Sequence, residues 1–171
     1  MDGDVYEGEW RDDKACGEGT YKHFNGAQYQ GQWLNDFQHG RGVETWVDGS
    51  KYEGYYGEGK KNGHGKYEWK DGSYFDGEWR ENKINGFGLY VWADGRQYKG
   101  NWLNNQMHGK GEYKWKDGRS YNGEYQHDKK HGFGVYTWAD GRKYAGEWQG
   151  SKRHGKGKII STDGSEREGI W

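Results

Sequence analysis

The amino-acid sequence predicts an all-β chain, an elongated, single-layer antiparallel meander of about seven β-hairpins. Three observations predict this fold: a motif that recurs every 23 residues, even spacing within the motif, and many glycines and aromatics beside few aliphatics. Even spacing is typical of a strand, because residues i, i+2 and i+4 lie on the same face. The repeat as a whole, rather than any single residue, therefore sets the fold.

The repeat keeps its period of 23 without one insertion. Each unit opens on an aromatic residue, has Gly two residues later and Trp or Tyr two residues after that, then Gly-x-Gly and a closing Asp-Gly or Asn-Gly. We expect a single array over residues 1–171, with repeats that begin at residues 6, 29, 52, 75, 98, 121 and 144 and a partial eighth from 167. Both a naturally short chain and an excerpt of a longer protein stay open. The opening aromatics are Tyr6, Tyr29, Tyr52, Phe75, Tyr98, Tyr121 and Tyr144.

The fifth unit illustrates how one repeat is expected to form a hairpin. A six-residue polar loop over 103–108 joins its two strands, and Asp117-Gly118 forms the tight turn into the next unit. A glycine has no side chain, so a neighbouring aromatic ring can pack directly on the backbone there. Glycines and aromatics are therefore expected to share a face. The residues of that face are Tyr98, Gly100 and Trp102 on the first strand and Gly109, Gly111, Tyr113 and Trp115 on the second.

The composition explains why such a chain can fold with few aliphatic residues. Val, Ile, Leu and Phe number only 17 of 171 residues, which alone would indicate disorder. The 11 Trp and 15 Tyr side chains can replace them, because each buries roughly 150–250 Å². The sequence has no apolar run long enough to span a bilayer and no signal-peptide pattern at its start. With Cys16 as the single cysteine no internal disulfide can form, so we expect a cytoplasmic protein.

The pattern Tyr-x-Gly-x-Trp, Gly-x-Gly and Asp-Gly at a period of 23 resembles the MORN repeat (membrane occupation and recognition nexus). The resemblance covers seven consecutive units and implies a meander without a two-layer core. It also implies the contexts in which the family occurs: cytoskeletal and ciliary scaffolds, junction proteins that appose membranes, and accessory regions of some phosphatidylinositol phosphate kinases. The departures from the pattern are Glu44, His23, Ser161 and Arg167.

The opposite face of each second strand follows a longer period, 46 residues. Largely apolar residues occupy this face in the second, fourth and sixth units, whereas the first, third and fifth units carry mostly charged residues there. Two interpretations stay open: the apolar strips support β-propensity, or they dock a partner protein or a second copy of the chain. The residues of the two strips are Phe87, Leu89 and Val91 in the fourth unit and Phe133 and Val135 in the sixth.

The second-strand aromatics are the other candidates for a protein-binding surface. They would line the aromatic face at regular intervals, which favours a non-catalytic scaffold that receives a partner segment or forms a homodimer. The alternative is that these rings only pack against one another and stabilise the sheet. The residues concerned are Tyr67, Trp69, Tyr90, Trp92, Tyr113, Trp115, Tyr136 and Trp138.

The loops that join the two strands of each unit carry an excess of basic residues. The simplest interpretation is a solvated turn surface. The alternative function is peripheral binding of an anionic phospholipid, such as a phosphoinositide, since each basic residue near a membrane contributes about 1 kcal/mol. That alternative rests on Lys129, Lys130, Lys152 and Arg153.

Other function classes find little support in the sequence. No unit carries an added acid, base or nucleophile, so we expect no enzymatic activity and no cofactor. The recurring histidines at residues 39, 108, 131 and 154 are expected to stand about 10 Å apart in neighbouring units, too far to share one metal ion. The net charge of −1 argues against nucleic acid as a partner.

Overall fold

A computed structural model describes residues 3–171, and it divides the chain into two compact units, Met1–Ile84 and Asn85–Trp171. Each unit is described by itself. The prediction of an all-β fold is confirmed, since residues 3–171 contain strands and turns but no helix. Consequently none of these residues forms a helix that could cross a membrane.

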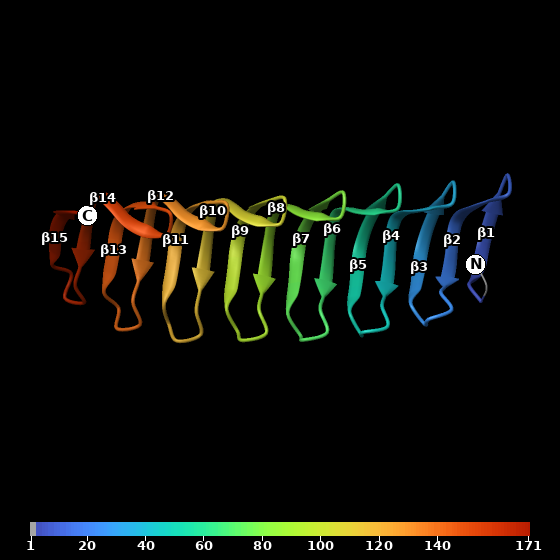
Figure 1. Ribbon diagram of the computed structural model, residues 1–171, viewed down its shortest axis with the longest axis horizontal. Helices are drawn as coiled ribbons and strands as arrows, with labels where there is room; N and C mark the ends of the chain where they lie inside the picture. Colours follow the sequence, from blue (N-terminus) through green and yellow to red (C-terminus); the bar gives the residue numbers. More distant parts are fainter. Residues whose placement is uncertain (1–2) are drawn as a thin grey trace. The chain divides into compact units, whose positions relative to one another are not determined.

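The first unit is a single-layer antiparallel meander in which consecutive strands pair with one another. Short and long strands alternate along it, and a tight turn separates each strand from the next (Figure 1). Each repeat contributes one short and one long strand, as the hairpin prediction requires. Its strands are β1 (Val5–Arg11), β2 (Lys14–Lys22), β3 (Gln28–Leu34), β4 (Phe37–Thr45), β5 (Lys51–Gly57), β6 (Lys60–Glu68) and β7 (Tyr74–Arg80).

The second unit has the same construction, and its first strand, β8, begins two residues before the unit does. Consecutive strands again pair antiparallel from β8 to β15. The strands are β8 (Lys83–Val91), β9 (Gln97–Leu103), β10 (Gln106–Lys114), β11 (Ser120–Gln126), β12 (Lys129–Thr137), β13 (Lys143–Gln149), β14 (Lys152–Ile160) and β15 (Glu166–Ile170).

The register places glycine opposite glycine at the centre of each pairing. In the fifth repeat Gly100 pairs with Gly111 and Tyr98 pairs with Tyr113, so the aromatic face is the one expected from the even spacing. The next pair in the register joins Trp102 to Met107. Between these two pairs the first strand spans two residues, from Gly100 to Trp102, and the second spans four, from Met107 to Gly111. Extra residues on one strand form a β-bulge, which bends the hairpin.

The prediction of a six-residue loop over residues 103–108 is wrong. β9 ends at Leu103 and β10 begins at Gln106, so only Asn104 and Asn105 form the turn. Both have positive φ, 46° and 70°, the geometry of a type I′ turn, which follows the right-handed twist of the two strands. The strands are therefore longer than the sequence predicted, because the bulge lies inside the strand pair and not in a loop.

The expected tight turn at Asp117-Gly118 is confirmed. The amide N–H of Gly118 donates to the Trp115 carbonyl and that of Trp115 donates to the Arg119 carbonyl, which defines a three-residue loop. Gly118 has φ of 97°, a conformation that costs glycine little, and the Asp117 carboxylate accepts the Arg119 amide N–H at 3.1 Å.

The aromatic rings lie on glycine, as expected. The Tyr121 ring covers Gly134 so closely that a Cβ atom added there would collide with the ring and its hydroxyl group. That hydroxyl donates to the Glu124 carbonyl at 2.8 Å, and the Trp148 indole N–H donates to the Gly134 carbonyl at 3.1 Å. The single layer thus has a core of buried rings, several of which, including Tyr98, Tyr121 and Trp148, are also hydrogen-bonded to the sheet backbone.

Candidate protein-binding surface

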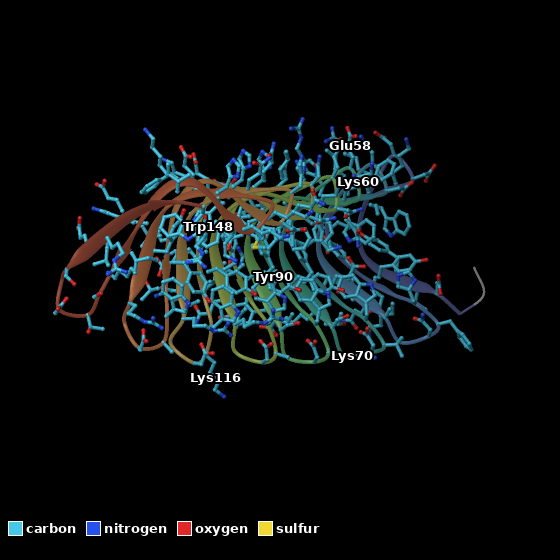
Figure 2. All side chains as sticks on the ribbon, turned by 60° about the vertical axis from the view of Figure 1, so that its left-hand side comes forward. Glu58, Lys60, Lys70, Tyr90, Lys116 and Trp148 are labelled. Carbon is cyan, nitrogen blue, oxygen red and sulfur yellow. The ribbon has the colours of Figure 1, made fainter. Side chains whose placement is uncertain are left out.

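The aromatic side chains of the second unit form two layers above one face of the sheet. The lower layer consists of the opening residues Tyr98, Tyr121 and Tyr144, whose side chains are fully buried. The upper layer comes from the second strand of each repeat and the turn after it, and most of its rings are only half-buried. Tyr90, an upper ring, and Trp148 lie on the inner side of the bent sheet, whereas Lys116 projects from the turn edge (Figure 2).

The upper layer is a continuous row of rings, which we call the ring ladder. Neighbouring ring centroids are 4.4–5.8 Å apart, and most pairs are tilted by 36–57° rather than perpendicular. These separations are typical of stabilising aromatic contacts. The rings of this row are half-buried, except Tyr113, which is 7% exposed. The ring ladder consists of Tyr90, Trp92, Tyr113, Trp115, Tyr136 and Trp138.

Arginine–aspartate pairs border the ring ladder at its Asp-Gly edge. The Arg119 Nε donates to the Asp117 carboxylate at 2.9 Å, and the guanidinium lies 5.0 Å from the centroid of the Trp115 ring. The Arg119 side chain and amide hold the pKa of Asp117 below its usual range. The pairs Arg96–Asp94 and Arg142–Asp140 repeat this arrangement over the other two tryptophans. At these positions the charges of arginine and aspartate offset each other.

Two cations of the predicted lipid site lie among the rings rather than at the turn edge. The Lys130 ammonium is 5.5–5.7 Å from the centroids of four rings, Trp115, Tyr121, Tyr136 and Trp148. Burial among these rings lowers the pKa of Lys130. The Arg153 guanidinium lies 5.7–6.0 Å from three further rings, those of Trp138, Tyr144 and Trp171.

The other two members of the predicted lipid site are exposed at the turn edge, and Arg153 is exposed as well, so Lys130 alone of the four is half-buried. Lys129 and Lys152 are the first residues of their strands, directly after a two-residue turn. The even spacing of the sequence could have distinguished Lys130, on the aromatic face, from its neighbour Lys129. Counting back in steps of two from Gly134 through Gly132 leads to Lys130 and places it on the aromatic face. The sequence interpretation missed this because it ended the strand at the glycine.

The first unit carries the same surface with one interruption. Tyr67 and Trp69 are half-buried and in contact, with ring centroids 4.7 Å apart. Glu44 occupies the place that tyrosine has in the other units, and its carboxylate accepts the Tyr56 hydroxyl at 2.7 Å. Lys61, the counterpart of Lys130, lies 5.3–5.9 Å from four rings, and the nearby Glu44 carboxylate partly offsets the lowering of its pKa by burial.

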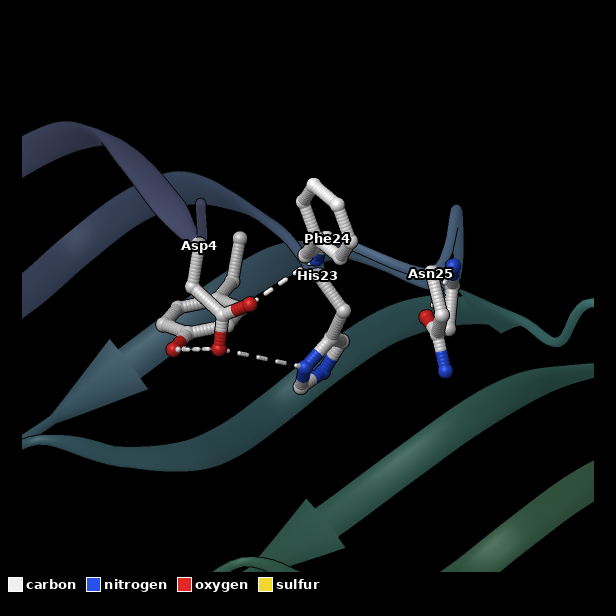
Figure 3. A network of polar contacts seen from close by, with 6 residues as sticks. Asp4, His23, Phe24 and Asn25 are labelled. Carbon is white, nitrogen blue, oxygen red and sulfur yellow. Dashed lines mark hydrogen bonds and ion pairs between the residues drawn. The ribbon is translucent and has the colours of Figure 1, made fainter. Parts of the chain in front are cut away.

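A polar network closes the first unit where the repeat lacks its tryptophan. The Asp4 carboxylate accepts hydrogen bonds from the Tyr21 hydroxyl and from the amide N–H of Phe24, both at 2.8 Å (Figure 3). His23, which replaces the tryptophan, lies 3.7 Å from the same carboxylate. The amide of Phe24 is the main cause that lowers the pKa of Asp4. This carboxylate therefore organises the first turn and is not free to bind a ligand.

The apolar strips lie on the face opposite the rings. Phe133 and Val135 alternate with the inward residues of β12, and Phe133 is 58% exposed. Phe87 is 51% exposed in the fourth repeat, while Leu89 and Val91 are half-buried. Between the strips, β10 presents the ion pair Lys114–Glu112 at 3.1 Å. The strips are thus separate patches, unlike the continuous ring ladder.

Residues 3–171 contain no group of three or more His, Cys, Asp or Glu side chains arranged to hold a metal ion. Among the recurring histidines, His108 packs against His127 with ring centroids 5.2 Å apart. Cys16 is a half-buried free thiol. The ring ladder with its inward cations is therefore the most extended candidate site on the described chain.

Comparison with known proteins agrees with this architecture. No curated protein matches the chain. Among solved structures, the SAS-4 (dCPAP) TCP domain of Drosophila melanogaster is similar over 91% of this chain and 84% of its own, with 11% identity and a TM-score of 0.56. A virginiamycin B lyase from Staphylococcus aureus covers 98% of this chain and 74% of its own, at 9% identity and a TM-score of 0.24, too low to support an argument.

The family comparison addresses the repeats directly. The MORN repeat matches seven times, at residues 6–28, 29–51, 52–74, 75–95, 98–118, 121–141 and 144–166. These matches begin at the residues where the sequence pattern placed its seven units. The chain therefore belongs to the MORN repeat family.

Proposed function

We propose that this chain is a non-catalytic protein-interaction module whose aromatic face receives an extended segment of a partner protein. The single observation that carries the proposal is the ring ladder, whose rings other than Tyr113 are only half-buried while a separate lower layer is fully buried. A layer that only held the sheet together would be fully buried, as Tyr98 and Tyr121 are. The two layers thus differ in accessibility: the lower rings are fully buried, and the upper rings other than Tyr113 are half-buried.

A proline-bearing segment in the polyproline II conformation fits such a surface. Grooves lined by aromatic rings bind these segments because the segment is already extended and loses little entropy on binding. The similar SAS-4 domain was solved in complex with a proline-rich motif of Ana2, which supports a peptide partner in general. The cytoskeletal, ciliary or membrane-associated assemblies that the family resemblance implies are settings in which such a module would join two proteins.

The experiment is affinity capture from a native extract with matched variants of the bait. We expect the chain to retain a partner that a Trp115→Ala/Tyr136→Ala variant loses, because these rings line the surface but not the buried core. The control is Leu89→Glu/Val135→Glu, which places charge on the opposite face. If this control loses the partner and the ring variant retains it, the proposal is wrong. Near-UV circular dichroism confirms that both variants are folded.

The opposite face supports self-association as the second candidate. The exposed Phe133 and Phe87 side chains would be covered in a homodimer. A hydrodynamic mass above 19.9 kDa that the Leu89→Glu/Val135→Glu variant reduces to the monomer value would support it. The phospholipid alternative has less support, since two of its four basic residues lie among rings. Sedimentation with anionic vesicles that a Lys129→Glu/Lys152→Glu variant abolishes would revive it.

A further inference from the structure

The aromatic face of the second unit carries positive charge without a matching negative charge. Three basic residues occupy inward positions in residues 85–171: Lys130 pairs with Tyr125, Arg153 with Trp148, and Arg167 with Ile159. None of them forms an ion pair within 4.0 Å among the described residues. An unpaired ammonium among rings is costly, because burial removes much of its hydration.

Most carboxylates of this unit have partners elsewhere. At the Asp-Gly edge, Asp94, Asp117 and Asp140 each bind the arginine two residues later. Those on the opposite face include Glu112, which binds Lys114, and Glu166, which binds Lys158. Two further carboxylates accept backbone amides, Asp128 from Met107 and Glu124 from Phe133. The cations of the aromatic face are therefore left for a group from outside the chain.

The first unit has a lysine at the equivalent position, Lys61, which likewise forms no ion pair within 4.0 Å among the described residues. Lys61 has the Glu44 carboxylate nearby on the same face. Beside Lys130, the repeat position equivalent to Glu44 is occupied by Tyr113. The Tyr113 hydroxyl accepts a hydrogen bond from the Arg96 guanidinium at 3.0 Å. The fold itself needs no cation at the position of Lys130. One repeat earlier the equivalent residue is Met107, which pairs with Trp102 in the same register.

We infer that the segment received by the aromatic face of the second unit carries an aspartate or glutamate whose carboxylate binds Lys130, while Arg153, in the next repeat, adds positive charge to the same face. The inference rests on the proposed function and adds the chemistry of the partner. The apolar residues of the segment contact the ring ladder, and its acidic side chain lies over Lys130. Lys130 is half-buried. A charge-assisted hydrogen bond to it is therefore stronger than one at an exposed surface, so the acid gives specificity as well as affinity.

The test is selection from a random dodecapeptide library displayed on phage, with the intact chain as the target. A Lys130→Met/Arg153→Gln variant serves as the comparison, because the chain already has methionine and glutamine at these repeat positions, in Met107 and Gln38. The matched control is Lys129→Met/Lys152→Gln, which removes the same charge from the neighbouring exposed positions.

We expect peptides retained by the intact chain and by the control to share one acidic position between apolar or proline residues. The Lys130→Met/Arg153→Gln variant should retain apolar peptides without that acidic preference. For a selected peptide, replacing Asp by Asn should weaken binding to the intact chain on the order of tenfold and leave binding to the variant unchanged. Raising the salt concentration should weaken binding of the Asp peptide only.

Three results would overturn the inference, and they differ in what they say about the proposed function. Peptides that need the ring ladder but show no acidic preference would refute the acidic partner and leave the interaction module intact. Equal retention of peptides by the intact chain and by the Trp115→Ala/Tyr136→Ala variant would refute both. Loss of the acidic preference in the exposed-lysine control would also refute it, because overall charge would then account for the selection.

Discussion

Single glycines decide how closely the rings approach the sheet. At Gly65, a Cβ atom would collide with the fully buried ring and hydroxyl of Tyr52, and that hydroxyl is held by the Tyr55 carbonyl at 2.9 Å. At Gly57, the nearest atom would be the amide nitrogen of Asn62, 3.2 Å away at the end of a flexible side chain. The two glycines thus differ in whether the neighbouring atoms can move aside.

We expect Gly65→Ala to lower the free energy of unfolding by about 2–3 kcal/mol, because overpacking displaces a ring that cannot move. Gly57→Ala should change it by less than about 1 kcal/mol. Urea denaturation followed by tryptophan fluorescence measures both values. Equal effects of the two substitutions would show that loss of glycine flexibility, rather than collision with the ring, dominates.

The turn aspartates make stability depend on pH. Hydrogen bonds from Ser50 are the main cause that lowers the pKa of Asp48, and those from Arg119 act in the same way on Asp117. A carboxyl group whose pKa is lower in the folded than in the unfolded chain stabilises the fold above its unfolded pKa. That contribution is lost as the pH falls through the lower, folded value.

We therefore expect the free energy of unfolding to be constant near neutral pH and to fall below about pH 4. Asp117→Asn should make the fall shallower, because asparagine can still accept the amide N–H but does not titrate. Urea denaturation at a series of pH values tests this. A stability that rises on acidification would contradict the assignment of these carboxylates.

At the scale of the strand and turn, neighbouring repeats are joined by hydrogen bonds at the two-residue turns. The Asp128 carboxylate accepts the Met107 amide N–H at 2.7 Å, and the Asp128 amide N–H donates to the Met107 carbonyl at 3.0 Å. Asp128 has φ of 67°, which asparagine and aspartate tolerate better than other residues with a side chain. Asn82 makes the same pair of bonds with Lys61 in the first unit.

Asp128→Ala should destabilise the chain by about 1–2 kcal/mol, since it removes an acceptor and places alanine at positive φ. Asp128→Asn should cost less than about 0.5 kcal/mol, because asparagine keeps both properties. Thermal or urea denaturation of the two variants makes the comparison. If the alanine variant is as stable as the asparagine variant, the turns do not couple the repeats.

The same turns mark the limit of what the sequence could predict. The period of 23, the even spacing and the Asp-Gly pairs predicted the strands, the aromatic face and the three-residue turns. The two-residue turns were missed because Asn104-Asn105 and His127-Asp128 lack the glycine that usually signals a type I′ turn. Because the second strand of each repeat is predicted to begin only at its Gly-x-Gly, the sequence places Lys130 in a loop, whereas β12 begins at Lys129. The unequal burial of the two ring layers depends on side-chain packing, which spacing alone does not contain.

At the scale of the whole chain, repetition without a two-layer core means that the register of each strand depends on the one before it. A strand shifted by one residue turns every side chain to the other face. In β11, Tyr121 and Tyr125 are buried, whereas Gln126 is exposed. The period of 23 keeps this alternation from one repeat to the next, so whole repeats should be removable while partial ones should not.

Deleting residues 101–123 joins Gly100 to Glu124 and preserves the alternation, because exactly one period is lost. We expect this variant to fold, with an m-value in urea lower by about a seventh, since one repeat of seven no longer unfolds. Deleting residues 101–122 instead joins Gly100 to Gly123 and turns Tyr125 to the face opposite Tyr98. That variant should lose its near-UV circular dichroism and aggregate. If both deletions fold equally well, the aromatic face does not set the register, and the ring layers would have to be explained in another way.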